Sequence, residues 1–281
     1  MTPPFSWPTS QTPDLPKFLA ALQRTESSKG RRTTQTFSIE GTRLLERALD
    51  EQQPLLGVLV AEEMAQSPTP RETALLERLT RLAIPLHIAP TERLRALVQG
   101  RTFGLCLGLV RLPPSDDLND MTSFMAQDRP LKILVLVDVM DPGNLGAMMR
   151  TGAASGIDAL LVWGGTDPFH PKAARTSMGA IFVNRIYTPY RFVDLLDTLH
   201  AHHIETIGAV VEGGLFPDGT VLSTRHALLM GSEAHGLPTD LQSRLLRRWS
   251  IPMHQGVDSF SVNAAAAILL YESLRKPLLN K

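Results

Sequence analysis

Two apolar runs near the end of the chain constrain its fold most, because each gives way abruptly to small and polar residues. Leu228–Met230 is followed by 231–236, a segment of Gly, Ser, Glu, Ala and His, and Ile251–Met253 is followed by the polar segment 258–263. We expect both runs to be buried strands. Since open α/β sheets bind ligands at the carboxyl ends of their strands, the two segments are predicted to face each other across a pocket. For either loop alone, an ordinary packing unit of strands and loops is the alternative.

Composition indicates a globular protein with more than one domain. The 281 residues exceed the usual size of a single domain, and 43% hydrophobic with 20% charged residues is ordinary for a soluble protein. No apolar run is long enough to cross a bilayer. Cys106 is the single cysteine and lies in an apolar run, which predicts a buried thiol and a cytoplasmic location. Cys and His show no metal-ligand spacing, so we expect no metal.

Four segments are expected along the chain. Residues 1–16 are rich in Pro, Ser and Thr and predict a flexible leader. Residues 17–112 alternate predicted strands with helices and should form a compact α/β domain, in which Thr25–Gln35 is an exposed loop. Two prolines followed by acidic residues predict a linker over 113–130, and 131–281 should form a second α/β domain.

The second domain opens with the apolar run Ile133–Val137. Such a run is typical of a central parallel strand covered on both faces. The turn that follows carries a proline and no G-x-G-x-x-G motif, which argues against an NAD-dependent dehydrogenase. Glycines that let a ligand approach the backbone come later, at Gly231 and Gly236, so a nucleotide-like ligand is expected on the far half of the sheet.

Two basic clusters occur in a chain whose formal net charge is zero. One includes Arg24, Lys29, Arg31 and Arg32, and the other lies within 244–248. Zero net charge argues against nucleic-acid binding by bulk charge, but local clusters can neutralise phosphates, and the first cluster is our predicted RNA-binding surface. The alternative for each cluster is an ordinary solvated face.

Asn144 and Arg150 lie on one predicted helix, among several small residues. Small side chains let another backbone pack closely against a helix. The guanidinium of Arg150 requires an anion or a carboxylate for its fork of donors. A structural salt bridge is the alternative role for this arginine.

Three segments together resemble the motifs of the SpoU-type RNA 2′-O-ribose methyltransferases of the SPOUT superfamily. In chain order they are 144–156, 229–237, and 251–253 with 258–260 before an Ala-rich helix. Residues 172–182 are similar to the linking motif of that family. Residues 32–49 are similar to the start of the L30e-like substrate-binding domain that many members carry. The resemblance covers nearly the whole chain after the leader.

The resemblance implies an α/β fold in two parts. These are an N-terminal L30e-like α/β domain and a C-terminal SPOUT domain, whose parallel sheet ends in a deep trefoil knot. It also implies a homodimer formed through the C-terminal domain, and S-adenosyl-L-methionine bound inside the knot. The residues implied to bind this cofactor are Leu229, Gly231, Ile251, Met253, Phe260 and Ser261, with Leu229 and Met253 flanking the adenine. Apolar walls suit an uncharged purine.

The same resemblance implies the catalytic residues. Arg150 matches the catalytic arginine, Asn144 its companion, and Glu233 and Ser259 the remaining polar positions. The chemistry is an in-line displacement, in which a ribose 2′-oxygen attacks the methyl carbon of a sulfonium. The reaction requires alignment of the oxygen, the methyl group and the leaving sulfur, and stabilisation of the oxygen as it loses its proton. A guanidinium is a poor proton acceptor, so we assign Arg150 to orientation and oxyanion stabilisation.

One position departs from the family pattern, because Ser261 stands where an Asn is usual. A hydroxyl replaces a carboxamide with two hydrogen-bonding ends, so at least one contact is lost or passes to water. Asn263 could take over only if the loop shifts. Our first hypothesis is a 2′-O-methyltransferase acting on structured RNA, with rRNA favoured and tRNA as the alternative substrate. A non-catalytic RNA-binding protein that retains the SPOUT fold is the rival class.

Overall fold

The computed structural model describes residues 15–98, 104–114, 117–189, 192–217, 222–256 and 258–279. The predicted leader falls outside these ranges except for its last two residues. The chain divides into two compact units, which are described separately. The first comprises Met1–Pro113 with Phe169–Phe182, and the second comprises Pro114–Pro168 with Val183–Lys281. Within the described ranges, every helix is too short or too polar to span a bilayer.

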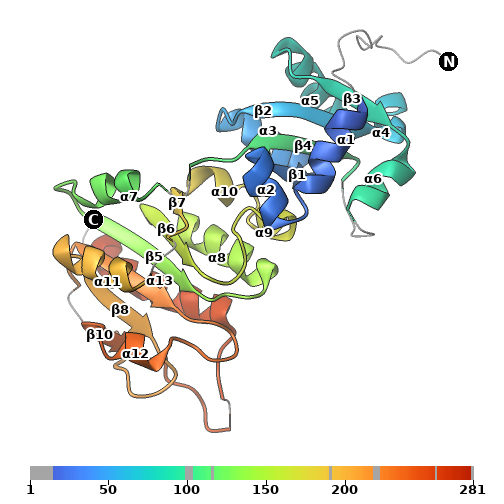
Figure 1. Cartoon of the computed structure of the whole chain (residues 1–281). Coiled ribbons are helices and arrows are strands. Elements are labelled where there is room, and N and C mark those ends of the chain that lie inside the picture. Colours follow the sequence, from blue (N-terminus) through green and yellow to red (C-terminus); the bar gives the residue numbers. More distant parts are fainter. Residues whose placement is uncertain are drawn as a thin grey trace. The chain divides into compact units, whose positions relative to one another are not determined.

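The first unit is built on a mixed sheet of four strands in the order β1-β4-β2-β3 (Figure 1). Strand β4 runs antiparallel to β1 and β2, while β2 and β3 are parallel. The elements are α1 (Leu15–Arg24), α2 (Ser28–Thr34), β1 (Thr36–Glu40), α3 (Thr42–Asp50), β2 (Leu55–Ala61), α4 (Glu62–Gln66), α5 (Pro70–Arg81), β3 (Leu86–Ala89), α6 (Thr91–Leu97), β4 (Cys106–Arg111), α9 (Pro171–Thr176) and α10 (Ala180–Val183).

The predicted exposed loop Thr25–Gln35 is wrong, because residues 28–34 form helix α2. The side chain of Ser27 accepts a hydrogen bond from the amide of Gly30 at 3.0 Å and caps the first turn. The helix ends at Gln35, which adopts a left-handed conformation with φ of 51°. A polar composition indicated a loop, but the cap at Ser27 and the burial of Arg31 stabilise a short helix instead.

The first unit includes a segment that is distant in sequence. Residues 169–182, which we expected within the second domain, pack here through contacts of α9 with β1. The Phe37 ring lies 5.1 Å from that of Phe169, and Arg175 pairs with the buried Glu40 at 3.4 Å. An aromatic contact and an ion pair with a buried carboxylate therefore hold this segment on the sheet of the first unit.

The predicted linker over 113–130 is wrong in its central part, where Leu118–Met125 forms helix α7. The side chain of Asp117 caps the helix by accepting hydrogen bonds from the amides of Asn119 and Asp120. Met121, Phe124 and Met125 are buried in the core of the second unit. Proline and acidic residues suggested a linker, whereas the acid at 117 is the N-cap of a packed helix.

The second unit is built on a wholly parallel sheet of six strands in the order β10-β8-β9-β5-β6-β7 (Figure 1). Its elements are α7, β5 (Leu131–Val137), α8 (Pro142–Ala154), β6 (Ala159–Trp163), β7 (Ile186–Tyr187), α11 (Phe192–Ala201), β8 (Glu205–Ala209), β9 (Arg225–Met230), α12 (Thr239–Gln242), β10 (Arg247–Trp249) and α13 (Val262–Leu279). The predicted central strand is β5, which is covered on both faces.

Successive side chains along the strands of this sheet point to opposite faces, and they fill one core on each face. Ile133, Val135 and Val137 face a cluster with residues of α7, α11 and α12. The intervening residues face the other side, where Leu134 lies beside Gly152 of α8, and α13 packs against α8 and β9. The result is a three-layer α/β unit, and the continuous apolar run in β5 reflects burial on both faces.

The second predicted strand near the end of the chain is displaced. The strand is β10 at the edge of the sheet, and Ile251–Met253 follows it as irregular chain. Between β10 and α13, residues of the chain line the same cavity as the loops that follow β8 and β9. The second basic cluster is partly neutralised here, since Arg244 pairs with Asp197 at 2.6 Å and Arg247 pairs with Glu205.

Candidate functional site

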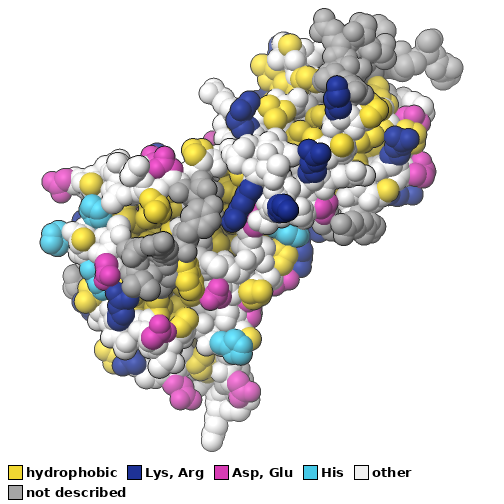
Figure 2. Space-filling model, viewed as in Figure 1, with side chains coloured by type: hydrophobic (Ala, Val, Ile, Leu, Met, Phe, Trp, Pro, Cys, Tyr) yellow, Lys and Arg dark blue, Asp and Glu magenta, His cyan; other side chains and the backbone are white. Residues whose placement is uncertain are grey.

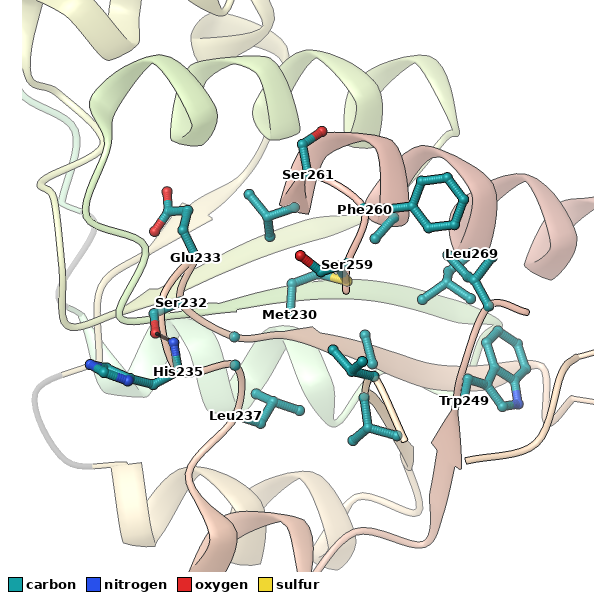
Figure 3. A pocket seen from close by; sticks show the side chains of 18 of the residues that line it. Met230, Ser232, Glu233, His235, Leu237, Trp249, Ser259, Phe260, Ser261 and Leu269 are labelled. Atoms are coloured by element: carbon teal, nitrogen blue, oxygen red, sulfur yellow. Dashed lines mark hydrogen bonds between the residues drawn. The ribbon is translucent and has the colours of Figure 1, made fainter. Parts of the chain in front are cut away.

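A cavity of about 790 Å³ lies at the carboxyl ends of β8, β9 and β10 in the second unit (Figure 3). Three loops that follow these strands form its walls, and the start of α13 closes it. Its lining residues are Asn144, Ala209, Val210, Val211, Glu212, Met230, Gly231, Ser232, Glu233, Ala234, His235, Gly236, Leu237, Gln242, Trp249, Ile251, Met253, Ser259, Phe260, Ser261, Val262, Ala265 and Leu269. The two loops predicted to face each other therefore line one cavity.

The loop after β9 folds back tightly on itself and requires glycine at its first position. Ser232 and Gly236 exchange two backbone hydrogen bonds of 3.0 and 3.1 Å. A Cβ on Gly231 would lie 2.0 Å from the carbonyl carbon of Gly236 and 2.2 Å from the amide nitrogen of Leu237. Both clashes are with backbone, so any larger residue at 231 must displace the loop.

Five of the six predicted cofactor-binding residues line this cavity, namely Gly231, Ile251, Met253, Phe260 and Ser261. The sixth, Leu229, does not line it, because its side chain is wholly buried in the core on the other face of the sheet. Successive side chains on a strand point to opposite faces, so Met230 lies at the cavity instead. Met230 and Trp249 were missed by the sequence reasoning, and strand alternation was the signal for Met230.

Ser261 lies at the start of α13 and also lines the cavity (Figure 3). Its hydroxyl accepts a hydrogen bond from the amide of Ala264 at 3.3 Å, and its carbonyl accepts one from the amide of Ala265 at 3.0 Å. These are the contacts of a helix N-cap, for which serine is well suited. The departure at 261 thus gives α13 a capping residue.

Asn144 and Glu233 are joined directly, although they are far apart in sequence. The Asn144 side-chain nitrogen Nδ2 donates to Glu233 Oε1 at 2.8 Å. The carboxylate also accepts hydrogen bonds from the amides of Met140 and Asp141, at 3.2 and 3.3 Å. Burial by itself would raise the pKa of Glu233, but these hydrogen bonds outweigh it and hold the pKa below its ordinary value. Glu233 is therefore an ionised acceptor at neutral pH.

The other two predicted catalytic residues differ in position. Ser259 lines the cavity and lies beside Met230 in the close view (Figure 3). Arg150 is exposed on α8, outside the lining of the cavity. Among the described residues it has no hydrogen-bond or salt-bridge partner, so the structure does not support the alternative role of an internal salt bridge. Its guanidinium remains available to an external anion.

Asn263 is a polar residue whose role the sequence reasoning did not foresee. It lies in the first turn of α13, and its Nδ2 donates to Asn144 Oδ1 at 2.7 Å. From the sequence, Asn263 was expected at most to replace the carboxamide that is missing at position 261. No signal in the sequence places α13 against α8, so this pairing was not predictable.

The residues of the second unit match a known family. The pattern described as the SpoU rRNA Methylase family matches residues 132–271. A 23S rRNA (guanosine-2′-O-)-methyltransferase RlmB of Pasteurella multocida is 30% identical over 215 residues, which cover 73% of this chain and 84% of that protein. The chain belongs to the SpoU rRNA methylase family.

Other SpoU relatives extend over almost the whole chain. The 23S rRNA (guanosine(2553)-2′-O)-methyltransferase RlmP of Bacillus subtilis is 28% identical over 254 residues, or 89% of this chain and 92% of that protein. A crystal structure of an RNA 2′-O ribose methyltransferase has 28% identity and a TM-score of 0.77, over 95% of this chain and 98% of the other. The AdoMet complex of AviRb from Streptomyces viridochromogenes, at 21% identity, has a TM-score of 0.79 over 93% and 99% of the two chains. The α/β fold with its parallel sheet is thus that of SpoU methyltransferases.

The predicted RNA-binding residues of this SpoU protein lie in the first unit. Arg24, Lys29 and Arg32 are exposed on α1 and α2. Arg31 is 1% exposed, and its guanidinium donates to the carbonyl of Thr25 at 2.6 Å. The prediction that Arg31 contacts RNA is therefore wrong, because its charge is not presented to solvent. In Figure 2 the Lys and Arg side chains of this unit are separated by apolar and uncharged surface.

The described residues of this SpoU protein contain no group of three or more His, Cys, Asp and Glu side chains placed to hold a metal ion. Cys106 is fully buried in β4, and burial raises the pKa of its thiol to about 12. The thiol is therefore protonated at neutral pH and lies outside the cavity.

Proposed function

We propose that this protein is an S-adenosyl-L-methionine-dependent methyltransferase that methylates a ribose 2′-hydroxyl in rRNA. The observation that carries the proposal is the cavity at the carboxyl edge of the parallel sheet, walled by all three motif segments of a SpoU family chain. Relatives with nearly the same length are named as 23S rRNA guanosine 2′-O-methyltransferases, so a guanosine of large-subunit rRNA is the first target to test. We expect the protein to act in the cytoplasm, and tRNA is the second substrate to test.

The residues present fit the cofactor. A volume of about 790 Å³ lies within the range of small-molecule sites, and Met230, Leu237 and Trp249 supply the apolar surface that suits a purine. We propose that Gly231, Ile251, Met253, Phe260 and Ser261 hold it, with Met230 in the place first given to Leu229. The absence of a Cβ at Gly231 leaves the loop free to adopt its fold. When bound, the cofactor supplies an electrophilic methyl group.

We assign the remaining chemistry to four polar residues. Arg150 orients the RNA and stabilises the 2′-oxygen as it loses its proton, and its lack of a partner among the residues that the structure describes supports this role. Asn144 and Glu233 form a fixed hydrogen-bonded pair at the rim of the cavity. Ser259 contributes a hydroxyl at the centre of the lining. Alignment and charge stabilisation are the main requirements of methyl transfer.

We further propose a homodimer formed through α8 and α13. Ala147 and Ala154 share one side of α8 by their spacing, and Tyr271 of α13 is 59% exposed. Small residues allow close packing of a second copy. Light scattering at micromolar concentration should give the mass of a dimer, and a monomer mass would contradict the proposal.

We also propose that the second unit is knotted and that the first unit is an L30e-like RNA-binding domain. The return of the chain from β10 to α13, past the loops after β8 and β9, supports a trefoil knot. The exposed side chains of Arg24, Lys29 and Arg32 support RNA binding by the first unit. A catalytically inactive RNA-binding protein is the rival function, motivated by the serine at 261.

Two experiments test this function together. Mapping 2′-O-methyl sites in total RNA from cells with and without the gene should reveal one rRNA position that depends on the gene. Calorimetry of the purified chain with S-adenosyl-L-methionine should show saturable binding. Binding without any lost methyl site contradicts the rRNA assignment, and the absence of binding favours the rival.

A further inference from the structure

Three side chains from different parts of the second unit form one hydrogen-bonded row. Asn263 Nδ2 donates to Asn144 Oδ1 at 2.7 Å, and Asn144 Nδ2 donates to Glu233 Oε1 at 2.8 Å. The row links the first turn of α13, the first turn of α8 and the loop after β9. Two of its members line the cavity, whereas Asn263 does not.

The ionised carboxylate of Glu233 sets the direction of the whole row. A carboxylate only accepts, so the carboxamide of Asn144 must turn its nitrogen toward Glu233. The oxygen of Asn144 then faces α13 and requires a donor there. Asn263 supplies that donor only with its nitrogen inward. Reversing either carboxamide would bring two acceptor oxygens together.

This orientation leaves the side-chain oxygen of Asn263 without a hydrogen-bond donor in the part of the chain that the structure describes. Oδ1 of Asn263 is buried and has no hydrogen-bond partner among the described residues. Leaving a buried acceptor unpaired is unfavourable, yet the opposite orientation would be worse because it would break the contact with Asn144. The main requirement at position 263 is therefore a hydrogen-bond donor directed at Asn144.

We propose that Asn263 is a positioning residue for methyl transfer, which acts by fixing the carboxamide of Asn144. This inference rests on the proposed function. With one N–H committed to Glu233 and one lone pair to Asn263, Asn144 has one N–H and one lone pair left for a ligand at the cavity. Ser261 has no carboxamide, whereas Asn263, two residues later, has one and directs it at Asn144 of α8.

A role in packing alone is the rival explanation, since the same contact joins α13 to α8. The two roles differ in what they predict when the hydrogen bonds of the row are reversed in direction. In Asn263→Asp, carboxylates lie at both ends of Asn144, so one of them must face its oxygen whichever way the carboxamide turns. In the double variant Asn263→Asp with Glu233→Gln, the row is complete again with the opposite direction, because Gln donates to Asn144 and Asn144 donates to Asp. Packing is then restored, but Asn144 offers a ligand its remaining N–H and lone pair in exchanged positions.

The experiment compares kcat and KM on rRNA for the wild type, Asn263→Leu, Asn263→Asp, Glu233→Gln and the double variant. We expect Asn263→Leu to lower kcat about tenfold, with KM for S-adenosyl-L-methionine changed by less than about twofold. Asn263→Asp should be worse at neutral pH. Adding Glu233→Gln should restore at least part of its thermal midpoint but not its kcat, because the carboxamide of Asn144 is then turned round. Thermal midpoints measured in parallel identify any variant that fails to fold.

Two results would overturn the inference. One is a wild-type kcat in folded Asn263→Leu. The other is a wild-type kcat in the double variant, which would show that the orientation of the Asn144 carboxamide does not matter. Turnover by the wild type tests the proposed function separately, because the role of Asn263 is judged only from the ratios of variants to wild type.

Discussion

The six strands of the second unit all run in one direction, whereas the four strands of the first unit mix antiparallel and parallel pairs. Both units alternate strands and helices along the chain. In the parallel sheet, the loops after β8, β9 and β10 meet at one edge and enclose a cavity of about 790 Å³. In the mixed sheet, β4 runs against its neighbours, so strand ends are divided between two edges.

This difference supports the different tasks that we propose for the two units. A parallel sheet gathers backbone groups and motif side chains at its carboxyl edge, which suits a small ligand. The first unit instead presents separate basic side chains on its surface, which suits contacts with phosphates. Substitutions at the parallel edge should therefore change turnover or cofactor affinity, and substitutions on the first unit should change RNA affinity.

The largest expected effect separates chemistry from cofactor binding. Arg150→Ala should lower methyl transfer by about 10²- to 10³-fold, the usual loss when a donor to a developing oxyanion is removed. Cofactor affinity measured by calorimetry should stay nearly unchanged, because Arg150 does not line the cavity. Arg93→Ala, an exposed arginine of the first unit, is the matched control. Undiminished activity in Arg150→Ala would exclude the assigned role.

A second substitution should affect the cavity itself. A Cβ at Gly231 would meet the backbone of Gly236 at 2.0 Å. Overpacking of this kind costs about 1–3 kcal/mol, so Gly231→Ala should weaken S-adenosyl-L-methionine binding by roughly ten- to a hundredfold. Ala201→Ser, at an exposed position of α11 outside the lining of the cavity, is the control and should bind within about twofold of the wild type. Equal affinities in the two variants would mean that the loop does not hold the cofactor.

A smaller effect is expected from the first unit. Replacing Arg24, Lys29 and Arg32 together by Ala should raise KM for rRNA and lower the salt dependence of RNA binding by about three in log–log slope. Affinity for S-adenosyl-L-methionine should not change. Filter binding over a range of salt concentrations measures the slope. A triple variant with the wild-type slope would show that RNA binds elsewhere.

The smallest effect concerns pH. The pKa of Glu233 is lowered in the folded protein, so its contribution to stability is present above the ordinary pKa of a glutamate and is lost as pH falls through the lowered value. The difference in thermal midpoint between wild type and Glu233→Gln should therefore be constant from pH 7 to about pH 5 and shrink below about pH 4. A difference that already changes near neutrality would contradict the lowered pKa.

Much of the second unit was predictable from its sequence. The continuous apolar run of β5 indicated a buried parallel strand, and the abrupt ends of two apolar runs indicated the two facing loops. The sequence did not indicate which face of the sheet Leu229 occupies. Leu229 and Met230 point to opposite faces, but both are apolar, so no polar–apolar pattern distinguishes the two faces. The strand expected at Ile251–Met253 lies earlier, at β10.

Other features depend on tertiary contacts that local composition does not encode. The basic stretch around Arg31 resembled a loop, but burial of that side chain and the cap at Ser27 stabilise a helix. Residues 169–182 follow β6 in sequence, yet their aromatic side chains pack against Phe37. The contact of Asn263 with Asn144 joins residues 119 positions apart, which no local pattern reveals.

The most direct test is methyl transfer in a purified system. The protein is incubated with isotopically labelled S-adenosyl-L-methionine and rRNA isolated from cells that lack the gene, and nucleosides from the digested RNA are analysed by mass spectrometry. We predict a single labelled nucleoside with its methyl group on the ribose 2′-oxygen, most simply a guanosine. A label on a base, or none at all in the presence of bound cofactor, would contradict the account.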